Sequence, residues 1–327
     1  MKVLVTGGSG YIGSTICSAL EDAGHMPIII DSLATGNPDF IGNRTFYQID
    51  ISDKNELNKV LESHKDLYAV IHCAAKIIVP ESVSNPIGYY QENVVKNLSM
   101  LNTIKNSSIK RIIFSSTAAL YNSTQNVQVS ENTDLKPISP YAKTKLAMEF
   151  AIEDYCIAYG LRGVSLRYFN PIGADPKMRS GPNLKKSTHI VGKLIEVSEN
   201  PHIKFEIAGN NWNTKDGTAI RDYIHVWDLA AAHIKALEKI DSITDEKEPF
   251  IAINIGSGMG ITVKEMIAAF EEITGNDIIQ IQAPKRPGDT IGNYADITKA
   301  YTQLDWYPRM SLEQGLADAI KWHKKQS

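Results

Sequence analysis

A short apolar segment that ends at a cluster of glycines limits the fold of this chain more than any other feature. Residues 3–5 are Val-Leu-Val, glycines stand at positions 7, 10 and 13, and Ile12, Ile16 and Leu20 follow at helical spacing. The pattern predicts a strand, a tight turn and a helix. Glycine allows a positive φ in the turn, lets the backbone approach a diphosphate, and lets the helix pack against the strand. The helix N-terminus would then present unpaired N–H groups and a partial positive charge to an anion.

A second buried strand completes this unit and ends at an acidic residue. Pro27–Ile30 is apolar, and Asp31 stands eighteen positions after Gly13. A carboxylate at this place can hydrogen-bond the ribose of an adenosine, and it repels a 2′-phosphate. No arginine follows before Arg44. The βαβ unit therefore predicts a site for NAD rather than NADP.

Apolar strands alternate with amphipathic helices through the first half of the sequence. Four further strands are expected, at residues 45–51, 68–75, 111–117 and 163–169. This alternation predicts a parallel sheet with helices on both faces, an α/β fold of the Rossmann-like doubly wound class. Ligands of such sheets gather at the carboxyl ends of the strands.

The expected strand ends carry small residues, which would leave room for a flat cofactor. Ala74, Ala75 and Ser116 are examples, although small residues also serve simply to pack helices closely. The residues expected to contact the cofactor are Gly7, Gly10, Tyr11, Ile12, Gly13, Asp31, Ser32, Asp50, Ile51, Cys73, Ala74, Ala75, Asn93, Ser115, Tyr141, Lys145, Tyr168 and Phe169.

The regular alternation ends after Asn170, where a proline- and glycine-containing polar loop begins. This change predicts departure into a smaller, mixed α/β lobe that binds the substrate. The cofactor-binding domain is expected to comprise residues 1–170 and roughly 219–250, and the smaller lobe roughly 171–218 and 251–327. Helices are expected at 188–198, 227–240, 262–274, 297–304 and 312–324, and strands at 204–208, 219–226, 250–255 and 278–282.

Composition argues against several other classes of protein. No apolar run approaches the roughly twenty residues of a membrane-spanning helix, and the first strand occupies the place of a cleaved signal. A net charge of −3 without a basic block gives nucleic acid no electrostatic footprint. Three cysteines without a C-x-x-C pair, and scattered histidines, predict buried free thiols in a reducing, cytoplasmic compartment and no metal site.

Tyr141 and Lys145 lie four residues apart at the start of an expected helix, after Ser139 and Pro140. This spacing places the phenol and the ammonium on one helix face. A free phenol titrates near ~10, and an adjacent ammonium with an oxidised nicotinamide would bring phenolate within reach at neutral pH. Such a tyrosine can take a proton from a carbinol while a hydride leaves the same carbon. Thr117, at the end of an expected strand, can hydrogen-bond the same hydroxyl. A Tyr and a Lys at this spacing also occur often on helix surfaces without a function. The catalytic interpretation therefore depends on the dinucleotide-binding fold that precedes the pair.

With these motifs in order, the chain resembles the extended short-chain dehydrogenase/reductase family. Five segments look like those of the nucleotide-sugar 4-epimerases of that family, over essentially the whole chain: Val3–Gly13, Ser139–Lys145, Leu166–Gly173, Asp216–Val226 and Arg286–Asp289. The segment 216–226, DGTAIRDYIHV, is the most specific. The resemblance implies an isomerase that interconverts UDP-glucose and UDP-galactose through a 4-keto sugar. It also implies that Tyr141 is the base and that NAD stays bound through turnover.

Related proteins with other activities differ at defined positions. Dehydratases of this fold use an Asp-Glu pair after the threonine, where this chain has Ala118 and Ala119, and a related decarboxylase uses a Glu in place of Ala119. Epimerisation of a different UDP-sugar and a net dehydrogenase reaction stay open as alternatives. A nucleotide-sensing binding protein is another, but such proteins usually lose the Tyr/Lys pair that this chain keeps.

The resemblance also implies a set of residues for the UDP-sugar. Asn170 corresponds to a donor to the diphosphate or sugar, and Arg221 and Arg286 to diphosphate partners, since a guanidinium grips phosphate oxygens two at a time. Taken alone, Arg286 and Asp289 could equally form a surface ion pair. The full expected set is Thr117, Asn170, His189, Ile190, Ala208, Arg221, Arg286, Asp289 and Asn293, with Asp289 at the ribose and His189 and Ile190 around the uridine.

Asn293 bears on the choice of sugar. Relatives restricted to glucose and galactose can have a bulky Tyr at this place, beside the sugar 2-substituent, whereas Asn leaves space for an N-acetyl group. The resemblance therefore implies that UDP-N-acetylglucosamine is also accepted.

Two expected helices, 87–104 and 141–159, carry more apolar residues than one inward-facing stripe needs. Met148, Ile152 and Ile157 are the examples in the second helix. Pairing of these helices across a two-fold axis, as in similar proteins, predicts a homodimer. Coverage by loops of the same chain is the alternative.

Overall fold

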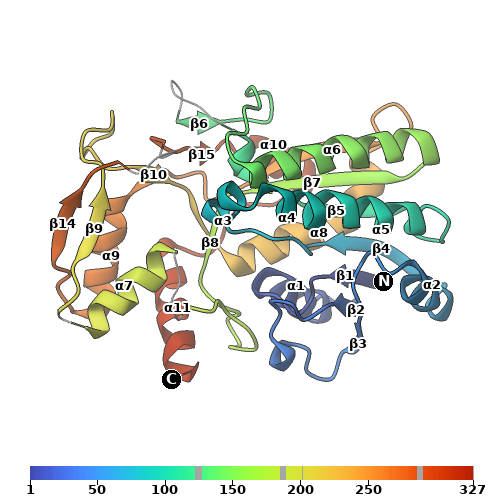
Figure 1. The fold of residues 1–327 in the computed structure, drawn as a ribbon, viewed down its shortest axis with the longest axis horizontal. Helices are drawn as coiled ribbons and strands as arrows, with labels where there is room; N and C mark the ends of the chain where they lie inside the picture. Colours follow the sequence, from blue (N-terminus) through green and yellow to red (C-terminus); the bar gives the residue numbers. More distant parts are fainter. Residues whose placement is uncertain (122–126, 185–188, 201, 286–289, 327) are drawn as a thin grey trace.

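Seven parallel strands form the central sheet of the larger lobe (Figure 1). The structure is a computed structural model that describes residues 1–121, 127–184, 189–200, 202–285 and 290–326. The strand order is β12-β7-β5-β4-β1-β2-β3, which switches sides between β1 and β4 and confirms the doubly wound fold. The strands are β1 (Lys2–Thr6), β2 (Met26–Asp31), β3 (Thr45–Gln48), β4 (Leu67–His72), β5 (Arg111–Ser115), β7 (Arg162–Tyr168) and β12 (Phe250–Ile255).

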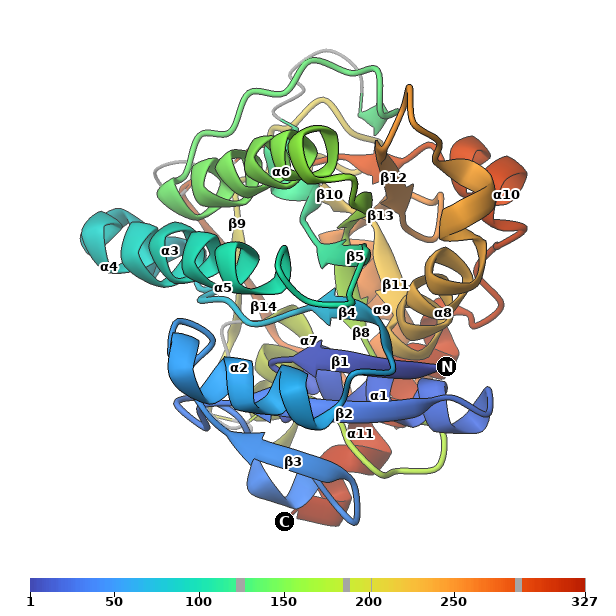
Figure 2. The same cartoon turned by 90° about the vertical axis from the view of Figure 1, so that its right-hand side faces the viewer.

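Helices cover both faces of this sheet because side chains alternate along each strand. Val3 and Val5 of β1 pack into one apolar cluster, and Leu4 packs into another on the opposite face. Figure 2 shows the two helical layers on either side of the strands. The first layer contains α1 (Tyr11–Asp22), α8 (Val226–Ile243) and α10 (Thr298–Leu304), and the second contains α2 (Lys54–Ser63), α5 (Lys96–Ile104) and α6 (Pro140–Tyr159).

Local sequence signals set the bounds of α6, the helix that carries Tyr141. The Ser139 hydroxyl accepts a hydrogen bond from the backbone N–H of Ala142 at 3.2 Å. Pro140 occupies the first turn, where a missing N–H costs little. The helix ends at Gly160, whose φ of +64° favours glycine. Tyr141 therefore lies in the first turn, close to the end of β5.

The smaller lobe is built around a separate apolar cluster that includes Leu194, Phe270 and Leu316. These residues come from the three helices of the lobe, α7 (Ile190–Glu199), α9 (Val263–Thr274) and α11 (Leu312–Gln326). The parallel pair β9 (Phe205–Ala208) and β14 (Gln280–Ala283) joins them. Two further pairs are β8 (Asn170–Ile172) with β11 (Tyr223–His225), and β10 (Ile220–Arg221) with β13 (Ile261–Thr262).

Shorter elements connect the layers. β6 (Gln128–Val129) pairs with β15 (Tyr294–Ala295), and 3₁₀ turns occupy Pro38–Phe40 and Ala118–Leu120. The helix expected over 87–104 is divided into α4 (Pro86–Tyr90), a π-helical turn (Gln91–Val95) and α5, and α3 (Val79–Ser84) precedes them. Asn85 separates α3 from α4, and its side chain caps α4 by accepting from the N–H of Gly88.

The expected start of the smaller lobe at residue 251 is wrong. β12 belongs to the central sheet, where Ile253 pairs in parallel with Leu166 of β7. α10 likewise packs on α8 and β12, in the larger lobe. The sequence predicted this strand at 250–255 but not the sheet that it joins, because the pairing of a strand with a distant part of the chain is decided by the partner strand.

The strands end earlier than the sequence predicts, and this creates the loops of the site. β4 ends at His72 and β5 at Ser115, although the N–H of Cys73 still donates to Thr6 O at 3.1 Å. The N–H of Ser116 likewise donates to Leu166 O at 2.9 Å. Ala74, Ala75 and Thr117 therefore lie beyond the sheet, in loops.

No helix in the described part of the chain has the length and apolar character to span a membrane. The three cysteines are free, with Cys17 and Cys156 buried and Cys73 half-buried. Burial raises the pKa of all three thiols, so they are poor nucleophiles.

Candidate active site

The glycine turn between β1 and α1 is packed too tightly for any other residue at two of its positions. Gly7 has a φ of +67°, and a Cβ there would lie 2.8 Å from the backbone nitrogen of Ala74. A Cβ at Gly13 would lie 2.2 Å from the carbonyl oxygen of Gly7. Gly10 precedes α1 and gives it no side-chain cap. The first N–H groups of α1 are thus left for an anion at this turn.

Asp31 lies against this turn at the end of β2. Its carboxylate accepts hydrogen bonds from the N–H groups of Ser9 at 3.1 Å and Leu33 at 2.9 Å. A Cβ at Gly36 would lie 2.0 Å from the Ser9 hydroxyl, which is buried without a hydrogen-bond partner. Ser32 is exposed beside it. The acid is therefore held rigidly next to the glycine turn, as a ribose partner must be.

Two residues at the glycine turn, Tyr11 and Ile12, make contacts within the protein. The Tyr11 hydroxyl donates to the carbonyl of Gly173 at 2.7 Å, which ties α1 to the loop after β8, and burial raises its pKa well above the usual value. Ile12 packs against the core of the larger lobe.

Asp50 and Asn93 are also engaged within the chain. Burial acts to raise the pKa of Asp50, but hydrogen bonds from Lys96 and Ser52 leave it below the usual value. The Asn93 amide receives the N–H of Lys76 at 2.8 Å and donates to its carbonyl at 2.9 Å. Asn93 therefore positions the loop after β4, while Ile51 is buried in the adjacent core.

The ends of β4 and β5 meet through side chains. The Cys73 sulfur lies 3.2 Å from the Ser115 hydroxyl, which in turn lies 2.9 Å from Nε2 of His233. Nδ1 of His233 faces the carbonyl of Leu229 at 2.9 Å. That carbonyl can only accept, so Nδ1 carries the proton and the Ser115 hydroxyl donates to Nε2. The Ser115 side chain is thus committed to the protein interior, whereas the backbone of Ala74 borders the glycine turn.

Tyr141 and Thr117 form the centre of the expected catalytic set. The Tyr141 ring is buried, and burial raises its pKa to about 12 despite an opposing hydrogen bond from Thr117. The sequence predicted an accessible phenolate with both the lysine and an oxidised nicotinamide beside the phenol, whereas the surroundings that the protein itself provides raise the pKa. The reason is that burial removes the phenolate from water.

Lys145 lies one turn further along α6 and is also buried. Its ammonium donates to the carbonyl oxygen of Ser115 at 2.8 Å and lies 4.8 Å from the centre of the Phe114 ring. Burial lowers its pKa to about 8. The ammonium is therefore bound by the end of β5 rather than by the phenol.

The end of β7 supplies the next three expected residues. Burial raises the pKa of Tyr168 well above the usual value, and Phe169 is buried in a small cluster with Tyr121. The Asn170 amide donates to the carbonyl of Asp222 at 3.0 Å.

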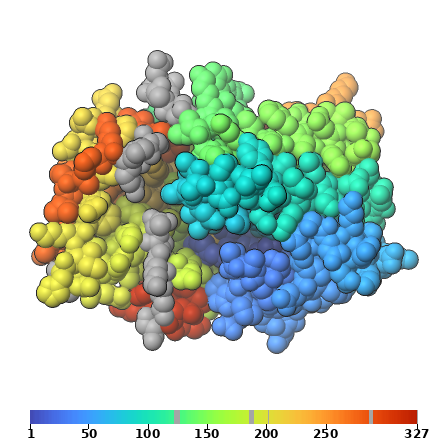
Figure 3. Space-filling model, in the orientation of Figure 1, coloured from blue at the N-terminus to red at the C-terminus, as the bar shows by residue number. Residues whose placement is uncertain are grey.

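Figure 3 shows a depression between the lobes, with N-terminal residues at its floor.

Arg221 lies beside the segment that leads to Asn293, and Asn170 is hydrogen-bonded to Asp222, the residue after Arg221. Arg221 lies so close to Gly292 that a Cβ there would be 2.1 Å from its Nη1. The N–H of Ile220 donates to Ile291 O at 2.8 Å, which holds the segment before Asn293 along β10. This backbone hydrogen bond brings together two segments that lie about seventy residues apart in the sequence.

His189, Ile190 and Ala208 form a second group on the smaller lobe. His189 caps α7 by accepting from the N–H of Val191 at 3.4 Å, and burial lowers its pKa to about 4. Ile190 is the first residue of α7, and Ala208 is the last of β9, which packs beside that helix. Arg286 and Asp289 lie outside the described residues.

The sequence matches the profile described as the NAD dependent epimerase/dehydratase family over residues 3–256. The chain belongs to this family. A relative at full length is the UDP-glucose 4-epimerase of Rhizobium leguminosarum bv. trifolii, 38% identical over 325 residues, which cover 99% of this chain and 98% of that protein.

Two solved structures show the same fold as this epimerase/dehydratase family member. A UDP-glucose-4-epimerase from Stenotrophomonas maltophila, with bound NAD and formylated UDP-arabinopyranose, has a TM-score of 0.93 and 32% identity and covers 100% of this chain and 98% of its own. The UDP-Glc/GlcNAc 4-epimerase from Campylobacter jejuni has a TM-score of 0.85 and 34% identity and covers 99% of each chain.

Sequence reasoning missed Asp222, which joins segments near Asn170, Ser257 and Ala295. Its fully buried carboxylate accepts from the N–H groups of Ser257 at 2.6 Å, Gly258 at 3.1 Å and Ala295 at 3.0 Å. Its backbone carbonyl accepts from Asn170. The sequence signal for Asp222 was its place inside the segment 216–226. An acid next to Arg221 in the sequence suggests an exposed ion pair, so its burial was not predicted.

Sequence reasoning also passed over Glu149, an acid four residues after Lys145 that is buried among β5 and β7. The spacing was visible, since residues four apart share a helix face. Its burial was not, because isolated acids on helices are usually solvated.

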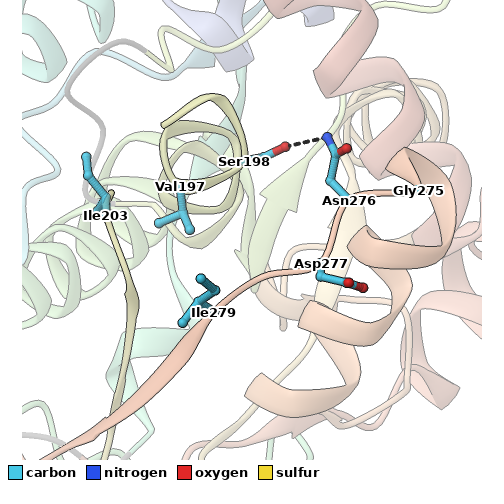
Figure 4. A pocket seen from close by; sticks show the side chains of 7 residues that line it. All are labelled: Val197, Ser198, Ile203, Gly275, Asn276, Asp277 and Ile279. Carbon is cyan, nitrogen blue, oxygen red and sulfur yellow. Dashed lines mark hydrogen bonds between the residues drawn. The ribbon is translucent and has the colours of Figure 1, made fainter. Parts of the chain in front are cut away.

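A separate hollow of about 260 Å³ lies away from these residues, where the ends of α7 and α9 meet. Figure 4 shows Ser198 and Asn276 joined across it by a hydrogen bond of 2.9 Å. No cluster of three or more metal-ligating side chains occurs in the described ranges.

Proposed function

We propose that this protein interconverts UDP-glucose and UDP-galactose at C4 of the hexose, with NAD as a bound cofactor. The observation that carries the proposal is the buried set of Thr117, Tyr141 and Lys145 at the end of β5, beside the glycine turn. Full-length relatives named UDP-glucose 4-epimerase support the choice of reaction. We assign the UDP-sugar to the smaller lobe, near Asn170, which is hydrogen-bonded to Asp222, and near Arg221, which lies against Gly292 next to Asn293.

The residues present fit NAD. Gly13 packs directly against Gly7, so the turn stays tight and the first N–H groups of α1 are open to a diphosphate, while Asp31 is held beside the turn for the ribose. Arg44, the next arginine along the chain, is bound to Glu21 at 2.7 Å and is not available for a 2′-phosphate. When bound, NAD supplies a place for the C4 hydride to be stored and returned.

The side chains of α6 and β5 handle the proton. Tyr141 accepts the proton of the sugar 4-hydroxyl and later returns it, and Thr117 orients the phenol. Burial opposes formation of the phenolate, so the positive charge of Lys145 is needed to favour it. Burial also excludes water from the keto sugar.

Dehydration, one alternative reaction, lacks its catalytic acid and base in this chain. Elimination of water needs an acid and a base after Thr117, but Ala118 and Ala119 form a 3₁₀ turn there. A net dehydrogenase would release a keto sugar and leave NADH behind.

Incubation of purified protein with UDP-galactose, without added NAD, tests the proposal. We expect UDP-glucose to form, and Tyr141→Phe to slow its formation by about a hundredfold or more. NADH that accumulates with a released keto sugar would establish a dehydrogenase instead. Thermal stabilisation by UDP-galactose without conversion would establish a sensor.

We propose that UDP-N-acetylglucosamine is a second substrate. Asn293 is half-buried beside Arg221 and is smaller than a tyrosine, so space remains for an N-acetyl group. A relative named for both substrates, at 34% identity, supports this range. Asn293→Tyr should abolish turnover of the acetylated sugar and spare UDP-galactose. If the parent protein fails to convert the acetylated sugar, the proposal of a second substrate is wrong.

We propose that the protein is a homodimer through α5 and α6, which pack side by side. Large apolar side chains stay exposed on this pair, with Phe150 57% and Ile157 66% exposed on α6. Met148 and Ile152, which the sequence assigned to the same surface, are instead buried in the core of the larger lobe. Light scattering should give about twice 36.2 kDa, and Phe150→Glu should lower it; a single-chain mass for the parent would rule out the dimer.

A further inference from the structure

Three residues of α6, spaced four apart, meet three consecutive residues at the end of β5. The Lys145 ammonium donates to Ser115 O at 2.8 Å, and Glu149 accepts from the Ser116 hydroxyl at 2.6 Å. The Thr117 hydroxyl acts to lower the pKa of the Tyr141 phenol. The first two of these α6 residues, Tyr141 and Lys145, belong to the proposed reaction, and the third has no assigned part.

Glu149 is bound on all sides. Besides Ser116, its carboxylate accepts from the Ser165 hydroxyl at 2.7 Å, and from Nε and Nη2 of Arg167 at 3.1 Å and 2.7 Å. The side chains of Glu149 and Arg167 are only 3% and 8% exposed. All of these partners lie on or at the end of β5 and β7, so one carboxylate joins α6 to two neighbouring strands.

The contacts of Arg167 continue to the far side of Thr117. Its Nη1 donates to the Tyr121 hydroxyl at 3.0 Å, and that hydroxyl donates to Asn254 at 2.8 Å. Tyr121 closes the 3₁₀ turn that begins at Thr117, through its N–H to Ala118 O at 3.0 Å. Thr117 is therefore bracketed by Ser116 on one side and Tyr121 on the other, and both are tied to the Glu149–Arg167 pair.

We propose that Glu149 is a positioning residue for the epimerisation, acting on Thr117 through Ser116 and on Lys145 through its charge. The proposal rests on the proposed function. A buried ion pair contributes little net stability because desolvation offsets its attraction. The Glu149–Arg167 pair is therefore better explained by its effect on geometry, because it fixes the position of residues 115–117 at the end of β5.

In the described part of the chain, the titratable groups that interact with the charge of Lys145 are Glu149 on α6 and His72 and Cys73 at the end of β4. Arg167 of β7 is paired with Glu149. Burial lowers the pKa of Lys145, and the charge of Glu149 acts in the opposite direction. Removal of that charge, with Arg167 left unpaired, would lower the pKa of Lys145 further.

Glu149→Gln in the NAD-containing protein tests the proposal. We expect kcat on UDP-galactose to fall at least about tenfold, because a small displacement of a catalytic group has a large effect on rate. KM should change by less than about twofold, and bound NAD should be retained. The alkaline limb of the kcat–pH profile should move to lower pH, since Lys145 loses its charge earlier. A merely structural role would leave this limb in place.

Two further variants keep the test decisive. Glu153→Gln, one turn along on the exposed face of α6, is the matched control and should behave as the parent. Ser116→Ala removes the link to Thr117 and leaves the ion pair intact, so it applies even if Glu149→Gln does not fold. It should lower kcat several-fold without moving the alkaline limb. Parental kcat in Ser116→Ala, or a parental kcat and pH profile in Glu149→Gln, would overturn the proposal. Absence of epimerisation by the parent protein would instead refute the proposed function.

Discussion

The Lys145 ammonium lies 2.8 Å from the carbonyl oxygen of Ser115, so the end of β5 holds the charge that the neighbouring phenol needs. Lys145→Met should therefore lower kcat about a hundredfold or more, because proton transfer loses its electrostatic support. Lys143→Met, two residues earlier and exposed, is the control and should match the parent. Initial rates on UDP-galactose at saturating substrate measure both. Equal rates for the two variants would exclude Lys145 from catalysis.

The same variant should change how stability depends on pH. Because burial lowers the pKa of Lys145 to about 8, the folded state binds fewer protons than the unfolded state between that pH and the usual lysine value of about 10.4. The contribution of Lys145 to the free energy of unfolding therefore rises with pH in this window, by on the order of 3 kcal/mol. Lys145→Met lacks this contribution, so its stability relative to the parent should decline as the pH increases from 7.5 to 10. Denaturant unfolding at the two pH values checks this; a constant difference would contradict it.

Gly13→Ala should abolish retention of NAD. Its Cβ would lie 2.2 Å from Gly7 O, which forces the turn away from the helix. Gly24→Ala is the control for general destabilisation, because Gly24 has a φ of +77° but open space around it. It should cost about 1 kcal/mol of stability and keep its NAD. The absorbance spectrum of the nucleotide released on denaturation gives the content of each variant. Full NAD content in Gly13→Ala would show that the turn does not hold the diphosphate.

Asp222→Asn should weaken substrate binding and lower stability. Burial raises the pKa of Asp222, and backbone hydrogen bonds from Ala295 and Ser257 oppose that shift. An amide in its place leaves at least one buried N–H unsatisfied, at a cost of about 1–3 kcal/mol, and loosens the segment next to Asn293. KM for UDP-galactose should rise several-fold while NAD content stays constant. Asp39→Asn, an exposed acid, is the control. An unchanged KM with a lowered melting temperature would limit Asp222 to a structural role.

The sequence by itself determined the features whose cause is local. The glycine spacing predicted the turn after β1, Ser139 and Pro140 predicted the start of α6, and a four-residue interval predicted that Tyr141 and Lys145 share a face. Steric freedom of glycine, capping and helical period act over a few residues, so they can be read along the chain.

Only the tertiary structure decided which distant residues come into contact and how burial shifts their pKa values. β12 joins the central sheet, Asp222 gathers segments near residues 170, 257 and 295, and Glu149 reaches two strands at once. The effect of burial on the pKa of Tyr141 could not be read from the sequence, because the cost of burying a charge depends on everything packed around it. Burial and long-range pairing are properties of the assembled chain, and no short stretch of sequence contains them.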